Sequence, residues 1–313
     1  LTICFIGIPC ITAYNVLASI FRGMGDSRSP MYFIAAACVV NIGLDFFFMG
    51  ALRLGPAGAA LGTTLSQAVS VLLALCVILK RKSIRLSKSD FCPRKVTMKD
   101  ILSIGLPVSA QDGFIQVSFM LITIMANQRG LTDAAAVGIV EKIISFLFLV
   151  PSSMLSTVSA LGAQNIGAGK YDRVDDILRY AIAIGVGFGA VMALLMQFIA
   201  PSMVRPFTSD EAVVKAGAAY IRSYIFDCLF AGIQFSFSGY FCAWGRSGLS
   251  FLHNTLSILL VRVPGAWLAC RFFPQTLVPM GLAPACGSLF SSIVCVLLYR
   301  WMKRQNKPTG DKD

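Results

Sequence analysis

The chain has 313 residues, of which 56% are hydrophobic and 13% are charged, and its formal net charge is +12. Because soluble globular chains carry about 25% charged residues, this composition excludes a cytosolic enzyme, a secreted disulfide scaffold, a disordered chain and a nucleic-acid module. Its apolar runs of about 20 residues can cross a hydrocarbon core about 30 Å thick. The sequence therefore predicts an all-α fold, a polytopic transmembrane helical bundle.

Nine apolar runs follow one another along the chain, and each is long enough for one membrane crossing. The first run begins at Leu1 without the basic segment that precedes a signal-peptide core, so we expect the chain to start inside a longer protein. The nine predicted spans are residues 2–21, 31–50, 57–79, 101–125, 136–158, 180–204, 219–242, 251–272 and 280–302.

Basic residues lie mostly in the short segments between these runs, where they indicate membrane topology rather than a nucleic-acid partner. Alternate segments should face the same side of the membrane. One alternating set, together with the C-terminal tail, holds 19 Lys and Arg residues, and the other set holds 6. The positive-inside bias places the first set in the cytoplasm, so residues 80–100 are predicted to be a basic cytoplasmic linker and 305–313 a cytoplasmic tail.

The ten cysteines are scattered, and the single histidine is His253. No CxxC pair or mixed Cys/His cluster occurs in the sequence, so we interpret the cysteines as small buried apolar residues and expect no certain metal site. An intramembrane enzyme would need a histidine cluster or a paired nucleophile and base. We therefore expect no enzyme and no cofactor.

Two parts of the chain resemble each other. FRGMGDSRSP at 21–30 ends one span and opens the next, and FCAWGRSG at 241–248 does the same. Downstream of them, GPAGAALGTTLSQAVSVLLAL at 55–75 is matched by GLAPACGSLFSSIVCVLLYRW at 281–301. The three spans before the linker thus match the last three spans of the chain, which indicates an internal duplication.

This duplication predicts the domain organisation. Residues 101–304 form a lobe of six spans, and residues 1–79 correspond to the last three helices of an equivalent lobe. Two related six-helix lobes joined by a cytoplasmic linker are typical of transporters, whose sites lie between the related halves.

Several motifs resemble the multidrug and toxic compound extrusion (MATE) family. RGMGDSRSP, NIGLD at 41–45 and GPAGAALGTTLSQ at 55–67 resemble its first lobe, and IGLPVSAQ at 104–111, VPSSMLSTVSALGAQNIGAGK at 150–170 and WGRSG at 244–248 resemble its second. Together they run from the fourth to the twelfth helix of that fold, so the first three helices would be absent. The resemblance implies a monomeric, multi-pass antiporter of the bacterial inner membrane with its C-terminus in the cytoplasm. It would export small organic, often cationic, compounds by alternating access in exchange for Na⁺ or H⁺.

Asp45 lies in the otherwise apolar segment VVNIGLDFFFMG. A carboxylate inside a membrane costs free energy, so it is a candidate for a functional role. Asn41 lies one turn earlier on the same helical face, and Thr63 and Thr64 lie in the next span. Such oxygen ligands suit a hard cation such as Na⁺, and the carboxylate could equally hold a proton. Alternatively, Asp45 lies near the outer interface and is structural. The family resemblance favours a coupling site at Asn41, Asp45 and Thr63, although that site also uses an Asp on the first helix.

The second lobe does not repeat this set. Aligning VRVPGAW with VNIGLDF puts Arg262 opposite Asn41 and Ala266 opposite Asp45, so we expect coupling in the first lobe alone. Arg262 and Pro264 are interpreted as a paired charge and a kink, with their role in structure or mechanism left open. A substrate or second cation site is expected from the further polar residues within spans, namely Asp112, Gln116, Asp227 and Gln234.

A second hypothesis keeps the two-lobe plan but assigns a different cargo, a lipid-linked glycan or cell-wall precursor. Relatives with that activity usually carry additional helices or an arginine-lined cavity. Arg262 is the one arginine well inside a predicted span here, so an exporter of organic cations is favoured.

Overall fold

The computed structural model describes residues 2–81 and 94–305, and within these ranges the chain is helical and contains no strand. Nine helical segments of the described residues are long and apolar enough to cross a membrane, which confirms the predicted polytopic helical fold. Most of the predicted 80–100 linker and the tail after Gln305 lie outside the described residues. The nine segments are Thr2–Gly23, Arg28–Ala51, Pro56–Lys80, Lys95–Gln128, Leu131–Gly167, Tyr171–Phe207, Glu211–Ala243, Ser247–Phe272 and Val278–Gln305.

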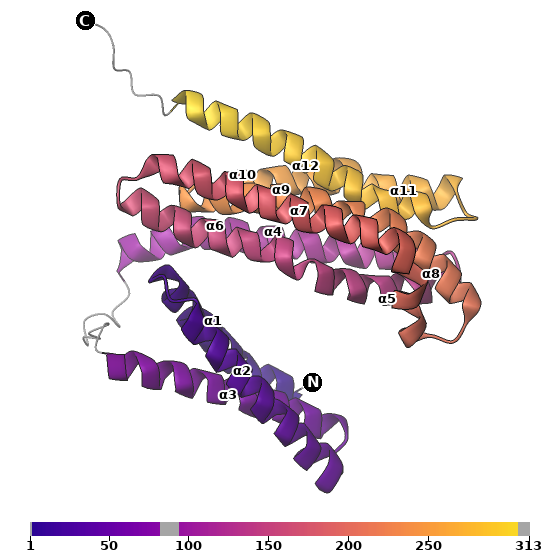
Figure 1. The fold of residues 1–313 in the computed structure, drawn as a ribbon. Helices are drawn as coiled ribbons and strands as arrows, with labels where there is room; N and C mark the ends of the chain where they lie inside the picture. The colour runs from indigo at the N-terminus through magenta and orange to yellow at the C-terminus, as the bar shows by residue number, and fades with distance from the viewer. Residues whose placement is uncertain (1, 82–93, 306–313) are drawn as a thin grey trace, which may run out of the picture. The chain divides into compact units, whose positions relative to one another are not determined.

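The chain divides into two compact units, Leu1–Arg94 and Lys95–Asp313. The elements of the first unit are α1 (Thr2–Gly23), α2 (Arg28–Asp45), the π-helical turn η1 (Phe46–Ala51) and α3 (Pro56–Arg81), coloured from indigo to purple in Figure 1.

Helix α3 packs against both α1 and α2. One stripe of α3 is buried at every fourth residue, beginning with glycine and serine and ending with larger apolar side chains. Small residues allow helix backbones to approach closely inside a membrane, so the glycine end of the stripe permits tight contact with α2. The stripe consists of Gly58, Gly62, Ser66, Ser70, Ala74 and Ile78.

The second unit contains six of the nine spans (Figure 1). Its elements are α4 (Lys95–Asn127), α5 (Leu131–Leu147), α6 (Leu149–Gly167), α7 (Tyr171–Val204), η3 (Arg205–Phe207), α8 (Glu211–Tyr224), α9 (Phe226–Ala243), α10 (Ser247–Ser257), η4 (Ile258–Arg262), α11 (Val263–Phe272) and α12 (Val278–Gln305).

Two spans of the second unit are interrupted by one non-helical residue, Phe148 between α5 and α6 and Ile225 between α8 and α9. A third span is divided into α10 and α11 by the π-helical turn η4. Pro151 contributes to the first break, because it lacks the backbone N–H that would donate to the carbonyl of Leu147 four residues earlier. That carbonyl instead lies 4.0 Å from the Sγ of Cys228. Proline breaks of this kind are tolerated in membranes where neighbouring helices contact the freed backbone.

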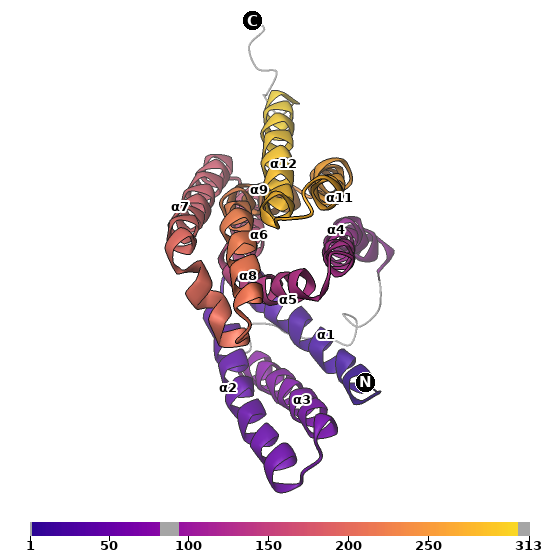
Figure 2. The ribbon, with the colours of Figure 1, turned by 90° about the vertical axis from the view of Figure 1, so that its right-hand side faces the viewer.

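Helix α9 is the centre of the second unit. It packs against α6, α7, α10 and α12, and its span is the most buried of the nine (Figure 2). Gly232 of α9 meets Gly185 of α7 so closely that a Cβ on Gly185 would lie 2.8 Å from the Gly232 Cα. The two helices therefore touch backbone to backbone, and larger residues at these positions would separate them.

The duplicated sequence folds into the same helix-ending turn in both units. Gly25 has φ +86° and Gly245 has φ +68°, a conformation that glycine adopts without steric cost. The residue after each glycine donates its N–H to the carbonyl of Phe21 (2.9 Å) or Phe241 (2.8 Å), which is the long hydrogen bond of a Schellman motif.

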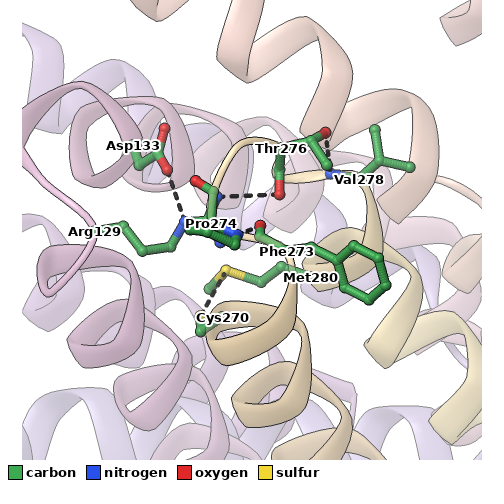
Figure 3. Close-up of polar contacts among 8 residues, drawn as sticks. All are labelled: Arg129, Asp133, Cys270, Phe273, Pro274, Thr276, Val278 and Met280. Carbon is green, nitrogen blue, oxygen red and sulfur yellow. Dashed lines mark hydrogen bonds and ion pairs between the residues drawn. The ribbon is translucent and has the colours of Figure 1, made fainter.

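Arg129 joins the turn between α4 and α5 to the connection between α11 and α12 (Figure 3). Its side chain is 6% exposed, and its Nε lies 2.7 Å from the Oδ2 of Asp133. Its two Nη atoms donate to the carbonyls of Phe273 (3.0 Å), Pro274 (2.9 Å) and Thr276 (3.1 Å). One planar guanidinium thus fixes a connection that has no helix of its own.

Candidate functional site

Asn41 and Asp45 come together at the C-terminal end of α2, above the backbone of α3. They are one helical turn apart and half-buried, and they lie over the buried residue Gly62. A Cβ on Gly62 would overlap the Oδ1 of Asp45 and lie 3.6 Å from the Nδ2 of Asn41. The predicted pair therefore shares one small polar space, and the absence of a side chain on Gly62 creates it.

Both side chains place an unpaired polar atom in this space. The Oδ1 of Asp45 and the Nδ2 of Asn41 are buried and make no hydrogen bond within the described residues. Buried polar atoms are nearly always paired, so such atoms call for a ligand, an ion or a proton. Rotation of the amide exchanges its oxygen and nitrogen, so the same pair can present two oxygens to a cation.

Thr63 directly follows Gly62, but its side chain is exposed within the described unit. Its hydroxyl donates to the carbonyl of Ala59 at 3.0 Å, which leaves its lone pairs available as acceptors. Thr64 is half-buried, and its hydroxyl donates to the carbonyl of Ala60 at 2.9 Å. The structure thus brings Asn41 and Asp45 together, and the Thr63 hydroxyl makes no hydrogen bond to either of them among the described residues.

A π-helical turn begins immediately after Asp45. In η1 the N–H of Leu52 donates to the carbonyl of Phe47, five residues earlier, at 3.0 Å. This wider turn shifts the direction of the following side chains relative to a continuous α-helix. Single π-turns occur frequently beside functional residues, and the sequence pattern gave no signal for this one.

The candidate polar residues of the second unit have different environments. Asp227 is 0% exposed, and both of its carboxylate oxygens lack hydrogen bonds within the described residues. Gln234, two turns later on α9, is 7% exposed and donates from Nε2 to the Oγ of Ser288 at 3.1 Å. Asp112 and Gln116 lie one turn apart on α4, and both are exposed in the described unit.

Arg262 has neighbours that sequence reasoning did not identify. It is 8% exposed, its Nη2 donates to the Oη of Tyr224 at 3.0 Å, and its Cζ lies 4.6 Å from the centroid of the Phe119 ring. The aromatic face and the phenol are both suitable partners for a guanidinium in an apolar region. The sequence placed Arg262 inside a span, but only the tertiary packing shows what surrounds it.

Glu141 belongs to the same region of the second unit. The hydroxyl of Thr123 lies 3.1 Å from its Oε1 and 3.2 Å from its Oε2, and the single hydroxyl proton is shared with the carbonyl of Phe119 at 2.9 Å. Thr123 lies one helical turn after Phe119, whose ring faces the Arg262 guanidinium. Lys142, the next residue, is exposed.

A protein-family model matches part of the second unit, and a curated relative aligns with nearly the whole chain. The MatE family model matches residues 107–268. A relative named "Probable multidrug resistance protein YpnP" from Bacillus subtilis (strain 168) is 30% identical over 304 residues, which are 96% of this chain and 67% of that protein. The "Multidrug export protein MepA" of Staphylococcus aureus (strain N315) is 26% identical over 252 residues, covering 79% of this chain and 54% of that protein.

Solved structures show the same fold. A MATE protein crystallised in complex with MaL6 matches with a TM-score of 0.91 and 22% identity, covering 98% of this chain and 70% of that one. The Vibrio cholerae MATE transporter VcmN matches with a TM-score of 0.87 and 18% identity, covering 94% of this chain and 66% of that one. The chain spans 47% to 67% of the length of the first five curated relatives.

Proposed function

This chain belongs to the MATE family of multi-pass membrane transporters, and on that premise we propose that it exports organic compounds by cation-coupled antiport. The family is a transporter family and not an enzyme family. The named relatives are multidrug resistance or multidrug export proteins, which supports small organic molecules, many of them cationic, as the cargo.

The observation that carries the proposal is the unpaired pair Asn41 and Asp45 above Gly62. A carboxylate in an apolar span is costly unless it binds a proton or a cation, and it can change its affinity when the surrounding helices move. We therefore assign the exchange of Na⁺ or H⁺ to Asp45. Asn41 supplies a second ligand, and Thr63 a third from the adjacent turn of α3. No other cofactor is needed for this exchange.

The polar residues of the second unit are proposed for the organic substrate or a second cation. Asp227 and Gln234 offer a buried carboxylate and amide, and Asp112 and Gln116 offer an exposed pair on α4. A carboxylate near aromatic side chains suits a lipophilic cation, because charge attraction and ring contact act together.

We also propose a location and an orientation. The protein lies in the bacterial plasma membrane as a monomer, with residues 80–100 and the C-terminal tail in the cytoplasm. The 19-to-6 distribution of basic residues between alternating segments supports this orientation. The flippase alternative is not favoured, since the named relatives are multidrug proteins.

The test compares Asp45→Asn with the unmodified protein, both expressed from the natural gene in a bacterial strain that lacks its main efflux pumps. Accumulation of a fluorescent cationic dye measures export. We expect Asp45→Asn to remove export with unchanged protein level, because an amide neither exchanges a proton nor neutralises Na⁺. Asp172→Asn, at the exposed start of α7, is the matched control and retains export.

Two ionophores separate the possible coupling ions. Monensin at constant membrane potential removes the Na⁺ gradient, and a protonophore removes the proton gradient. Export by the unmodified protein should stop with one of them in the presence of the other gradient. Normal gradient-dependent export by Asp45→Asn would contradict the assignment and move coupling to another carboxylate.

A further inference from the structure

The alignment of VRVPGAW with VNIGLDF puts Arg262 of the second unit opposite Asn41 of the first unit. The turns that precede the two segments have the same hydrogen bonds, and Arg262 lies 17 residues after Gly245 where Asn41 lies 16 residues after Gly25. Ala266, the counterpart of Asp45, is 0% exposed. A fully buried methyl group thus replaces the carboxylate, and a guanidinium replaces its amide partner.

The guanidinium is held in place but not neutralised by its direct contacts. Tyr224 and Phe119 position it through a hydrogen bond of 3.0 Å and a ring contact of 4.6 Å, and neither contact removes its charge. Its Nε is buried without a hydrogen bond in the described part of the chain. A buried charge with an unused donor needs an opposite charge nearby.

In the part of the chain that the structure describes, Asp227 is a buried negative group that lacks hydrogen-bond partners, as Arg262 is a buried positive group with an unused donor. It is 0% exposed, and neither carboxylate oxygen has a hydrogen bond within the described residues. It lies three residues after Tyr224, whose hydroxyl accepts the hydrogen bond from the Arg262 guanidinium. Glu141 differs, because its carboxylate has the hydroxyl of Thr123 within hydrogen-bond distance and its side chain is only half-buried. A buried carboxylate without partners must take up a proton, bind a cation or lie near a fixed positive charge.

We infer that Arg262 is a built-in cation for Asp227, so that this carboxylate binds no exchangeable Na⁺ or proton during transport. In the first unit, Asn41 and Asp45 are proposed to bind a free cation. In the second unit, the guanidinium of Arg262 takes the place of that cation. Of the two roles proposed for Asp227, binding of the organic substrate and binding of a second cation, only the first then remains. The inference stands on the geometry around Arg262 and does not require that Asp45 couples transport.

The test removes the positive charge of Arg262, so that the carboxylate of Asp227 must bind a free Na⁺ or a proton instead. Melting temperature is measured on detergent-purified protein in the Asp45→Asn background, so that the predicted spans of the first unit contribute no carboxylate. Arg262→Gln leaves Asp227 without a positive charge. We expect NaCl, but not choline chloride, to raise its melting temperature by about 3 °C or more, or a rise in pH in choline chloride to lower it by a similar amount. The first result identifies Na⁺ as the replacement cation, and the second identifies a proton.

Two further variants isolate the pair. Arg262→Gln/Asp227→Asn lacks the fully buried carboxylate of Asp227, so the dependences that Asp227 causes should disappear and the protein should melt at a higher temperature than Arg262→Gln alone. Arg262→Lys keeps the charge and should behave like the Asp45→Asn parent. The other ionisable groups that interact with Asp227 or Arg262 are the same in the single and double variants: Glu141, Tyr220, Tyr224 and Cys228.

Arg271→Gln is the matched control, because Arg271 is exposed and lies 5.5 Å from the Trp267 ring at the end of the same span. It should show neither dependence. The inference is overturned if the melting temperature of Arg262→Gln depends on neither Na⁺ nor pH. It is also overturned if adding Asp227→Asn to Arg262→Gln does not remove that dependence. If Arg262→Gln cannot be purified, recovery of folded protein in the double variant supports the inference, and failure of that recovery contradicts it.

Discussion

Gly62 on α3 faces Asp45 on α2 at a distance that leaves no room for a methyl group: a Cβ on Gly62 would overlap the carboxylate Oδ1. The polar space that holds Asp45 and Asn41 is therefore defined by a missing side chain on the opposite helix. Gly62 also lies in the buried stripe of α3, so the space is continuous with the close packing of the two helices.

We expect Gly62→Ala to remove gradient-driven export while the protein still reaches the membrane. The added methyl group must displace the Asp45 carboxylate or separate α2 from α3, and either change disturbs the proposed ligands. Gly43→Ala is the control on α2, since a Cβ at Gly43 has no neighbouring atom within 4 Å. Dye accumulation in a strain lacking efflux pumps measures both variants. Equal export by the two would show that the space above Gly62 has no part in transport.

The sequence predicted the parts of this site that depend on local geometry. Asn41 and Asp45 are four residues apart, so helical periodicity alone places them on one face. Their contact with Gly62 depends on the packing of a second helix, and no local pattern indicated it beyond the small residues of GPAGAALG. The π-turn after Asp45 has no sequence signal of its own, and therefore its effect on the direction of the following residues was not predictable.

The nine spans were predictable because each depends on the length and polarity of one continuous run. The breaks at Phe148 and Ile225 were not predicted, since the apolar runs continue through both. Arg262 and Tyr224 are 38 residues apart and meet only through packing of the second unit. Single-sequence patterns identify which buried charge needs partners, but they do not identify the partners.

Arg129 should be essential for the stability of the second unit. Arg129→Ala removes three hydrogen bonds to the 273–276 connection and the ion pair with Asp133. Since hydrogen bonds to charged groups contribute about 1.5–3 kcal/mol each, we expect a loss of about 3 kcal/mol or more, seen as a clear drop in melting temperature.

Arg205→Ala is the control for Arg129→Ala. Arg205 pairs with Glu211 at 3.2 Å, but the two side chains are 63% and 76% exposed. Exposed ion pairs contribute about 0–1 kcal/mol, so this variant should melt within a few degrees of the unmodified protein. A drop in melting temperature for Arg129→Ala no larger than that for Arg205→Ala would indicate that Arg129 acts only as a surface charge.

His253 is expected to connect three helices through its two ring nitrogens. It is 0% exposed and lies 3.0 Å from the Oγ of Ser238 on α9 and 2.7 Å from the Oγ of Ser291 on α12. His253→Phe keeps the ring but leaves both hydroxyls without this partner, at a cost of about 1–3 kcal/mol for each buried group left unsatisfied.

The measurement for His253 is a thermal melt of the unmodified protein and three variants. Ser238→Ala/Ser291→Ala in the His253→Phe background removes the unpaired hydroxyls and should restore part of the lost stability, because replacing both partners costs less than replacing one. The same two serine changes beside an intact His253 should be destabilising. Additive effects of the two sets would show that the ring and the hydroxyls do not interact.

The proposed orientation can be tested with two engineered cysteines in a cysteine-free background. Ser87→Cys lies in the basic segment assigned to the cytoplasm, and Ser209→Cys lies in the exposed connection between η3 and α8, which belongs to the opposite set of segments. Because the first set of segments holds 19 basic residues and the second holds 6, we expect a membrane-impermeant maleimide to label only Ser209→Cys in intact cells. Ser87→Cys should be labelled after permeabilisation. Labelling of Ser87→Cys from outside would reverse the orientation, and labelling of both cysteines from one side would contradict the alternation on which the orientation depends.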